Sequence, residues 1–159
     1  MNDATVLTPK QALPKAQAIF WGGLVAGILD AVDGVIAYGT QGLNPVQVLQ
    51  YIASGALGRS AFQGGLATAA LGAAFHFSIA WVAAAAFVLA SRRLEILKAH
   101  AVPAGLFYGA AVYFFMNYVV LPLSAVAPGT FQLGLFLNGV LGHALFVGLP
   151  ISLFARRAQ

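Results

Sequence analysis

Two aspartates inside a long apolar stretch are the residues of this chain that packing explains least well. Asp30 and Asp33 lie within GGLVAGILDAVDGVIAYG, residues 22–39, a stretch apolar enough to cross a lipid bilayer. The chain has four acidic residues, so half of them lie in this stretch. A carboxylate among apolar groups requires a partner or a proton. An ionisable residue at membrane depth is therefore by default a functional-site hypothesis.

Polar residues occur at a similar depth in each of the other long apolar stretches. Counted from the nearest flanking lysine or arginine, Asp30 lies 15 residues into its stretch, His76 16, Asn117 19 and His143 13. At about 1.5 Å of helix rise per residue, these separations are roughly 20–28 Å. We therefore expect Asp30, His76, Asn117 and His143 to converge in one buried cluster, with Asp33 one turn further out.

Small residues accompany these polar residues at helical spacing. Gly27 lies three residues before Asp30, and Gly72 and Gly139 each lie four residues before a histidine. Small side chains let helix backbones approach closely in lipid. The polar residues are therefore expected on the inward faces of their helices.

Three functional hypotheses use the two histidines. Because histidine changes charge near neutral pH, the cluster could relay protons or respond to them. Alternatively, Asp30, His76 and His143 could hold a divalent metal ion, since imidazole and carboxylate ligands suit zinc or iron. The third hypothesis makes His76 and His143 the axial ligands of a haem b.

A structural alternative assigns no chemistry to these residues. Polar side chains also hydrogen-bond between helices and fix their register, at below about 1 kcal/mol on average. The chain would then be a structural or accessory subunit of a larger membrane complex, or a homo-oligomer. Arg59 likewise has two interpretations: it anchors the chain at the lipid headgroups, or it reaches the outer mouth of the bundle and neutralises Asp33.

Composition excludes several classes of function. Hydrophobic residues make up 60% of the chain and charged residues 8%, so lipid is the expected surrounding of its helices. The net charge of +4 comes from basic residues scattered between apolar runs, which indicates no nucleic-acid-binding face. The absence of cysteine excludes disulfides and thiolate chemistry. The sequence holds no nucleophile–base pair at usable spacing and no phosphate-binding loop, so we do not expect an enzyme.

The elements that must position these residues are four membrane-spanning helices, expected at about 16–38, 64–90, 103–122 and 131–154. Between the first two, Asn44 and Pro45 form an N-cap and first helical position. Apolar residues then recur at helical spacing, which predicts a short amphipathic helix over about 44–54, lying on the membrane or capping the bundle. The fold class is therefore an all-α four-helix membrane bundle. It comprises a cytoplasmic tail (1–15), a transmembrane domain (16–155) and a basic C-terminal end (156–159).

Basic residues predict the orientation of these helices. Seven of the eight lysines and arginines fall on one side of a four-span topology, and cytoplasmic loops carry the excess of such residues. Both termini are therefore predicted to be cytoplasmic. The seven residues are Lys10, Lys15, Arg92, Arg93, Lys98, Arg156 and Arg157, opposed by Arg59 alone.

The order of these features resembles the YagU type of small bacterial inner-membrane protein. The similarity covers the four helices and rests on the following: a G-x-x-A-G-like first helix from Gly22 to Gly27, the core His76-Phe77-Ser78-Ile79, a third helix ending at Pro122, and Gly142-His143 running into Arg156-Arg157. The resemblance implies a multi-pass protein of the bacterial inner membrane, with acid tolerance as one suggested role. The two aspartates lie outside the resembling pattern.

A reporter that is active only outside the cytoplasm, fused after Gln159, tests the predicted orientation. We expect such a fusion to be inactive, because an even number of spans returns the C-terminus to the basic, cytoplasmic side. A fusion after Ser60 is the matched control and is expected to be active. The reverse pattern would contradict the orientation.

Overall fold

The computed structural model describes residues 13–127 and 129–158, and within them it contains helices and no β-strand. Residues 1–12 of the predicted tail, including Lys10, lie outside the described residues. The elements, in chain order, are α1 (Lys15–Gly39), α2 (Pro45–Leu57), the 3₁₀ helix η1 (Gly58–Gln63), α3 (Gly65–Ala90), α4 (Ile96–Ala99), α5 (Ala101–Phe115), the π-helical η2 (Met116–Val120), α6 (Leu133–Gly142), the π-helical η3 (His143–Gly148) and α7 (Leu149–Arg156).

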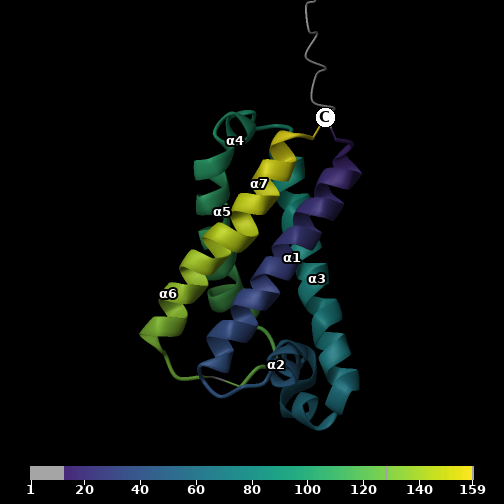
Figure 1. Ribbon diagram of the computed structural model, residues 1–159, viewed down its shortest axis with the longest axis vertical. Helices are drawn as coiled ribbons and strands as arrows, with labels where there is room; N and C mark the ends of the chain where they lie inside the picture. Colours follow the sequence, from purple (N-terminus) through teal and green to yellow (C-terminus); the bar gives the residue numbers. More distant parts are fainter. Residues whose placement is uncertain (1–12, 128, 159) are drawn as a thin grey trace, which may run out of the picture.

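Four helical segments are long and apolar enough to cross a membrane. They are α1, α3, α5 continued by η2 (Ala101–Val120), and α6 continued by η3 and α7 (Leu133–Arg156). Each end lies within two residues of its predicted position, so the predicted set of four long apolar helices is confirmed. Figure 1 shows α1 and α7 crossing side by side through the centre of the molecule, and the two helices are in contact.

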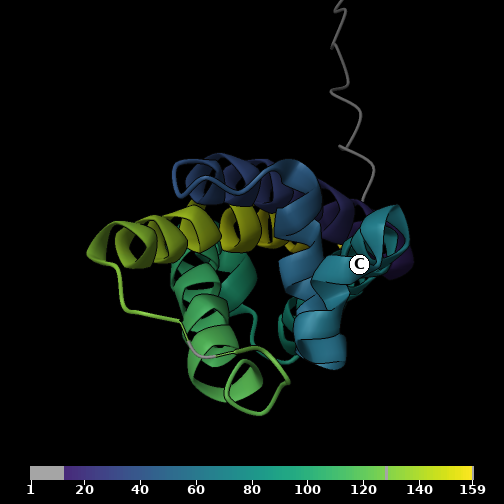
Figure 2. The ribbon, with the colours of Figure 1, turned by 90° about the horizontal axis from the view of Figure 1, so that it is seen from below.

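The predicted short helix is also present, as α2. The Asn44 side chain accepts a hydrogen bond from the Gln47 backbone N–H, and the Gln47 side chain accepts one from that of Asn44, both at 3.0 Å. This reciprocal capping satisfies two of the free N–H groups at the start of α2. Buried Gln50 donates to the Gly65 carbonyl at 3.0 Å. Since polar groups of α2 are turned inward, α2 caps one end of the bundle, which is the lower end in Figure 1 and faces the viewer in Figure 2.

The opposite end is closed by backbone and lysine contacts. The Leu13 N–H donates to the Arg157 carbonyl at 2.8 Å, and the Lys98 ammonium donates to the Ala158 carbonyl at 2.9 Å. The first and last described residues therefore lie side by side, next to the loop that holds α4 (Figure 1). The even number of long helices explains why both ends reach the same side.

The apolar core lies in the half of the bundle nearest these chain ends. It joins α1, α3, η3 and α7, and α5 contributes Tyr108, which packs against Phe87 at 4.9 Å and donates to the Ala83 carbonyl at 2.8 Å. The core residues are Ala18, Ala26, Ala83, Ala84, Phe87, Val88, Val147, Ile151, Ala155 and Ala158. Many are alanines, so the helix backbones approach closely here.

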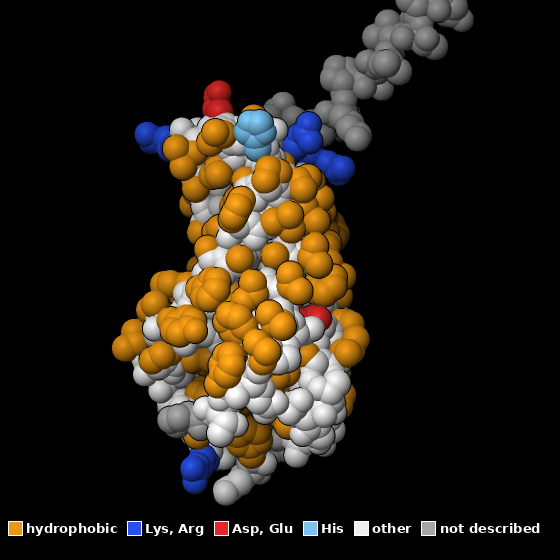
Figure 3. Space-filling view, turned by 90° about the vertical axis from the view of Figure 1, so that its left-hand side faces the viewer, with side chains coloured by type: hydrophobic (Ala, Val, Ile, Leu, Met, Phe, Trp, Pro, Cys, Tyr) orange, Lys and Arg blue, Asp and Glu red, His pale blue; other side chains and the backbone are white. Residues whose placement is uncertain are grey.

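Large apolar side chains cover the outside of the molecule. Phe107 is 79% exposed, Leu66 76% and Leu123 83%. Figure 3 shows hydrophobic side chains over the side walls, with lysine and arginine side chains at the two ends. A water-soluble monomer rarely exposes so much continuous apolar surface, whereas a helix in lipid is expected to.

Glycine lets α5 and the fourth long segment come into backbone contact. A Cβ at Gly109 would overlap the His143 carbonyl oxygen, and one at Gly148 would overlap the Gly105 carbonyl oxygen. The π-helical turn η3 is packed along α5 through these contacts. The position of His143 in the bundle therefore depends on Gly109.

Gly109→Ala tests this dependence. The added methyl must push η3 away from α5, so we expect the free energy of unfolding to fall by about 1–3 kcal/mol. Unfolding of the purified protein in mixed micelles, followed by circular dichroism, measures it. The matched control is Gly134→Ala in α6, where a Cβ meets nothing within 4 Å, so that stability should be unchanged or slightly higher. Equal effects of the two substitutions would contradict the close-approach argument.

Candidate functional site

Three of the predicted site residues meet in the middle of the bundle. One carboxylate oxygen of Asp30 lies 4.0 Å from Nδ1 of His76, and the other lies 3.5 Å from Nδ1 of His143. These residues come from α1, α3 and η3, so three of the four long segments contribute one each. We call Asp30, His76 and His143 the triad. The structure brings the Asp30 carboxylate within 4.0 Å of both rings.

The second nitrogen of His76 fixes where its proton lies. Nε2 of His76 is 2.8 Å from the backbone carbonyl oxygen of Gly27 on α1. A carbonyl oxygen only accepts, so Nε2 carries a hydrogen and donates it. Nδ1, which faces Asp30, is then protonated only if His76 is an imidazolium; otherwise favourable contact with Asp30 requires a proton on the carboxyl group. At 4.0 Å the two groups interact through charge and are not joined by a hydrogen bond.

Nδ1 of His143 has no hydrogen-bond partner among the described residues, although the atom is buried. Its closest ionisable contact is Asp30, at 3.5 Å, just beyond the usual length of a hydrogen bond. The ring also packs edge-on against Tyr113 of α5, with ring centroids 5.4 Å apart. His143 opens the π-helical turn η3, and single π turns inside α-helices frequently occur at functional sites.

The triad is partly rather than fully buried. The exposed fraction of the side chain is 12% for His76, 21% for Asp30 and 22% for His143. The expectation of a buried cluster is corrected in this respect: α1, α3 and η3 surround the charges without enclosing them.

Asp33 forms a second polar contact one turn further along α1. Its carboxylate accepts a hydrogen bond of 2.9 Å from the Asn138 side chain of α6. A Cβ at Gly142 would lie 2.5 Å from the same carboxylate oxygen, so glycine makes room for this contact. Asn138 was missed in the sequence analysis. The spacing of the residues could have indicated it. The first and fourth long segments run antiparallel, so residues before His143 lie at the depth of residues after Asp30. Asn138 lies five residues before His143, and Asp33 lies three after Asp30.

Asn117 does not join the triad through any contact of the described residues. Its side-chain amide donates to the backbone carbonyl of Tyr113, four residues earlier in the same helix, at 2.9 Å. The expectation that Asn117 lies at the edge of the cluster therefore lacks support. Equal depth along a helix does not fix the face on which a residue lies, and Asn117 falls within the π-helical turn η2, which changes that face.

Arg59 is exposed on η1, and among the described residues the ion-pair contacts are the two that join Asp30 to the histidines. Asp33 has a neutral amide as its partner instead of the guanidinium that one hypothesis assigned to it. Arg59 is therefore not the counter-ion of Asp33 in this structure. Its exposure agrees with the alternative role at the lipid headgroups.

The metal and haem hypotheses do not fit the arrangement of these side chains. Among residues 13–127 and 129–158, no three histidine, aspartate, glutamate or cysteine side chains are grouped so that they could hold a metal ion. Nε2 of His76 is also engaged by Gly27, which leaves it unable to ligate haem iron.

The Asp33–Asn138 contact can be measured by a double-mutant cycle of Asp33→Ala, Asn138→Ala and the double variant. Asn138→Ala leaves a carboxylate without its donor, so we expect it to cost about 1–3 kcal/mol of unfolding free energy. The double variant should be less destabilised than the sum of the single variants, by about 0.5 kcal/mol or more. Strict additivity in mixed-micelle unfolding would show that the contact contributes nothing.

Comparison with families of known proteins, with curated proteins and with solved structures found no match to this chain. Its function is therefore argued from the geometry of the triad.

Proposed function

We propose that this chain is a four-span integral membrane protein whose triad binds protons within the membrane. The observation that carries the proposal is the position of Asp30, with one carboxylate oxygen toward each of two imidazole rings. Aspartate and histidine together can exchange protons under physiological conditions, and histidine does so near neutral pH. The four apolar helices and the exposed apolar surface support placement in lipid.

The charge of the triad explains why proton binding is favoured there. With an ionised carboxylate and two neutral rings the triad carries one negative charge, and one bound proton makes its net charge zero. In surroundings less polar than water, an uncompensated charge is costly and a paired or neutral set is less so. This balance of charge supports the proposal that the triad takes up a proton.

Binding a proton alters the force between three helices. Asp30, His76 and His143 lie on α1, α3 and η3, and an imidazolium attracts the Asp30 carboxylate across these helices, whereas a neutral ring does not. Loss of the proton places a carboxylate against the lone pair of His76 Nδ1, which weakens the α1–α3 contact. The proposed role is thus a response to pH through helix packing. The triad offers no activated nucleophile, so we propose binding and not catalysis.

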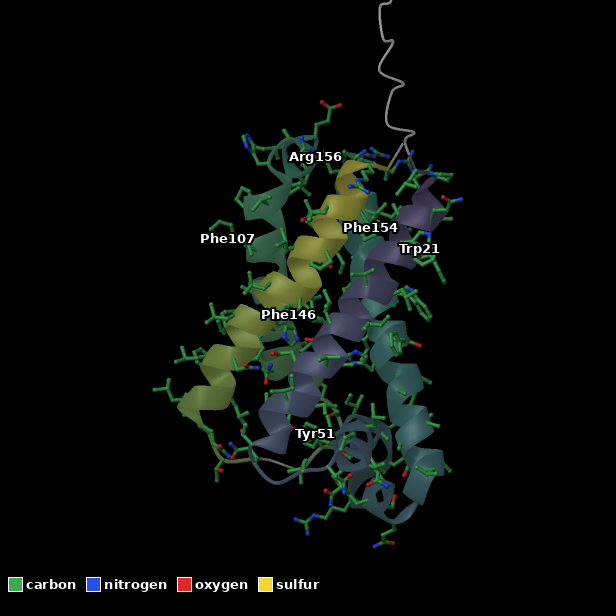
Figure 4. The ribbon with its side chains drawn as sticks, in the orientation of Figure 1. Trp21, Tyr51, Phe107, Phe146, Phe154 and Arg156 are labelled. Carbon is green, nitrogen blue, oxygen red and sulfur yellow. The ribbon has the colours of Figure 1, made fainter. Side chains whose placement is uncertain are left out.

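We propose the bacterial inner membrane as the location, with both termini cytoplasmic. The distribution of charge supports this: Arg59 lies at the α2 end, and the remaining described basic residues, Lys15, Arg92, Arg93, Lys98, Arg156 and Arg157, belong to the end where the chain termini meet. Figure 4 shows Arg156 at this end and Tyr51 of α2 toward the other. The membrane potential and anionic headgroups hold such a cationic end on the cytoplasmic side.

Nitrogen-15 NMR of histidine-labelled protein tests the proposal, because ring nitrogen shifts report protonation. We compare the parent with Asp30→Asn, which keeps the shape and removes the charge. The imidazolium fraction of both His76 and His143 at a given pH should fall, because the carboxylate charge that favours the imidazolium is gone. Exposed His100, in the loop beside α4, is the internal control and should be unaffected.

Unchanged titration of both triad histidines in Asp30→Asn would overturn the proposal. So would the absence of any titration of His76 and His143 between about pH 4 and 9, a range that spans the usual histidine values. A stability measurement distinguishes proton binding from a purely structural role. If the residues only pack the bundle, Asp30→Asn should be at least as stable as the parent at every pH, whereas proton binding requires the stability difference to vary with pH.

A further inference from the structure

We infer that the triad exchanges protons with water at the α2 end of the molecule only. This inference rests on the proposed function, because it assigns a direction to proton access at the same site. The observation behind it is that polar and apolar groups are divided unequally along the bundle. Apolar residues fill the side of the triad toward the chain ends, and polar side chains continue on the side toward α2.

On each of the three helices, a buried apolar residue lies one turn from the triad, on the side toward the chain ends. Ala26 precedes Asp30 by four residues and is 0% exposed, and Val147 follows His143 by four and is 5% exposed. On α3, Ala80 follows His76 by four residues and is also buried. These three side chains offer no hydrogen-bonding atom, so water has no partner there.

The blockage continues to the end of the bundle. Val88 and Ile151 are fully buried in the next turns, and Phe87 packs against Tyr108 of α5. The Tyr108 hydroxyl donates to the Ala83 carbonyl, so it is already engaged. Beyond this core, the hydrogen bonds from Leu13 to Arg157 and from Lys98 to Ala158 close the end. The buried hydroxyls of Ser91 and Ser152 in this half donate to the nearby backbone carbonyls of Val88 and Leu149. Because these polar side chains are already engaged, this half offers water no continuous polar route.

Polar side chains continue from the triad in the other direction. The first are Asp33 and Asn138, joined at 2.9 Å, and Tyr113, whose ring touches that of His143. Tyr38 follows Asp33 on α1, and its ring centroid lies 5.7 Å from that of Tyr51 on α2. Burial raises the pKa of the Tyr51 hydroxyl, so this group stays a neutral donor and acceptor at physiological pH.

Few titratable groups lie near the triad, and all but one lie on the α2 side. On α1 they are Asp33 and Tyr38, on α5 Tyr113, and on α2 Tyr51. The exception is Tyr108 of α5, whose hydroxyl is engaged by the Ala83 carbonyl on the chain-end side. Beyond the triad histidines, α3, α6 and η3 contain no titratable side chain, and the basic residues of the described ranges lie toward the two ends of the bundle. The proton occupancy of the triad is therefore set by water at one end, and the site responds to the pH of a single compartment.

Cysteine accessibility tests the inference directly, because the chain contains no cysteine. Single-cysteine variants are reconstituted into liposomes and treated with a positively charged, membrane-impermeant methanethiosulfonate, from outside or after loading inside. Ser60→Cys and His100→Cys, both at exposed positions, identify the α2 side and the opposite side. The two test positions are Asn138→Cys, in the polar half, and Val147→Cys, in the apolar half. Mass spectrometry measures the modified fraction.

We expect Asn138→Cys to react only from the side on which Ser60→Cys reacts, and Val147→Cys to react at least tenfold more slowly from either side. Reaction of either test position from the His100 side would overturn the inference. Lack of reaction at Asn138→Cys from both sides would also overturn it. If that variant fails to insert, Asp33→Cys takes its place with the same expectation.

The NMR titration of Asp30→Asn distinguishes this result from a failure of the proposed function. If the histidines respond to Asp30→Asn but Val147→Cys reacts from the His100 side, proton binding stands and one-sided access fails. If the histidines do not respond, the proposed function fails whatever the thiols show.

Discussion

The carboxylate of Asp30 constrains the rest of this structure, because its charge must be compensated by partners on other helices. An ionised group among apolar helices needs partners that compensate its charge, and a single imidazole can supply only one. Here the two carboxylate oxygens are directed toward two rings on different helices. Each ring needs a position that α1 can reach, so α3 and the fourth long segment must both pack against α1. Much of the arrangement of the bundle follows from that requirement.

Glycine and alanine make this packing possible. The Gly27 carbonyl receives His76, and the absence of a side chain at Gly142 leaves room for Asp33. Gly109 lets α5 support η3 from behind, so His143 is held against α1 by backbone contact. Small residues therefore have two effects here. They leave room for polar side chains to reach their partners, and they let the helices approach closely enough to gain dispersion energy.

The sequence predicted the long helices well because hydropathy and flanking charges define them independently of tertiary structure. The capping of α2 by Asn44 and Gln47 is also local, so its start could be predicted. The convergence of Asp30, His76 and His143 followed from depth along the helices. Depth carries no information about rotation, however, which is why the expected position of Asn117 gains no support and Asn138 was missed. The π-helical turns η2 and η3, which no propensity rule predicted, determine that rotation.

The π turn at His143–Gly148 has a consequence for how this segment tolerates change in length. A π turn is equivalent to one extra residue in an α-helix, and each residue of an α-helix advances the azimuth by about 100°. Asn138 and Gly142 of α6 face α1 before this turn, and Ile151 of α7 enters the core after it. The π turn thus absorbs one additional residue while the two halves stay in phase with the same neighbours. Deleting one residue between 144 and 148 would leave a regular α-helix with α7 still in its core, whereas deleting one within α6 or α7 would turn one part of the segment by about 100° against the other.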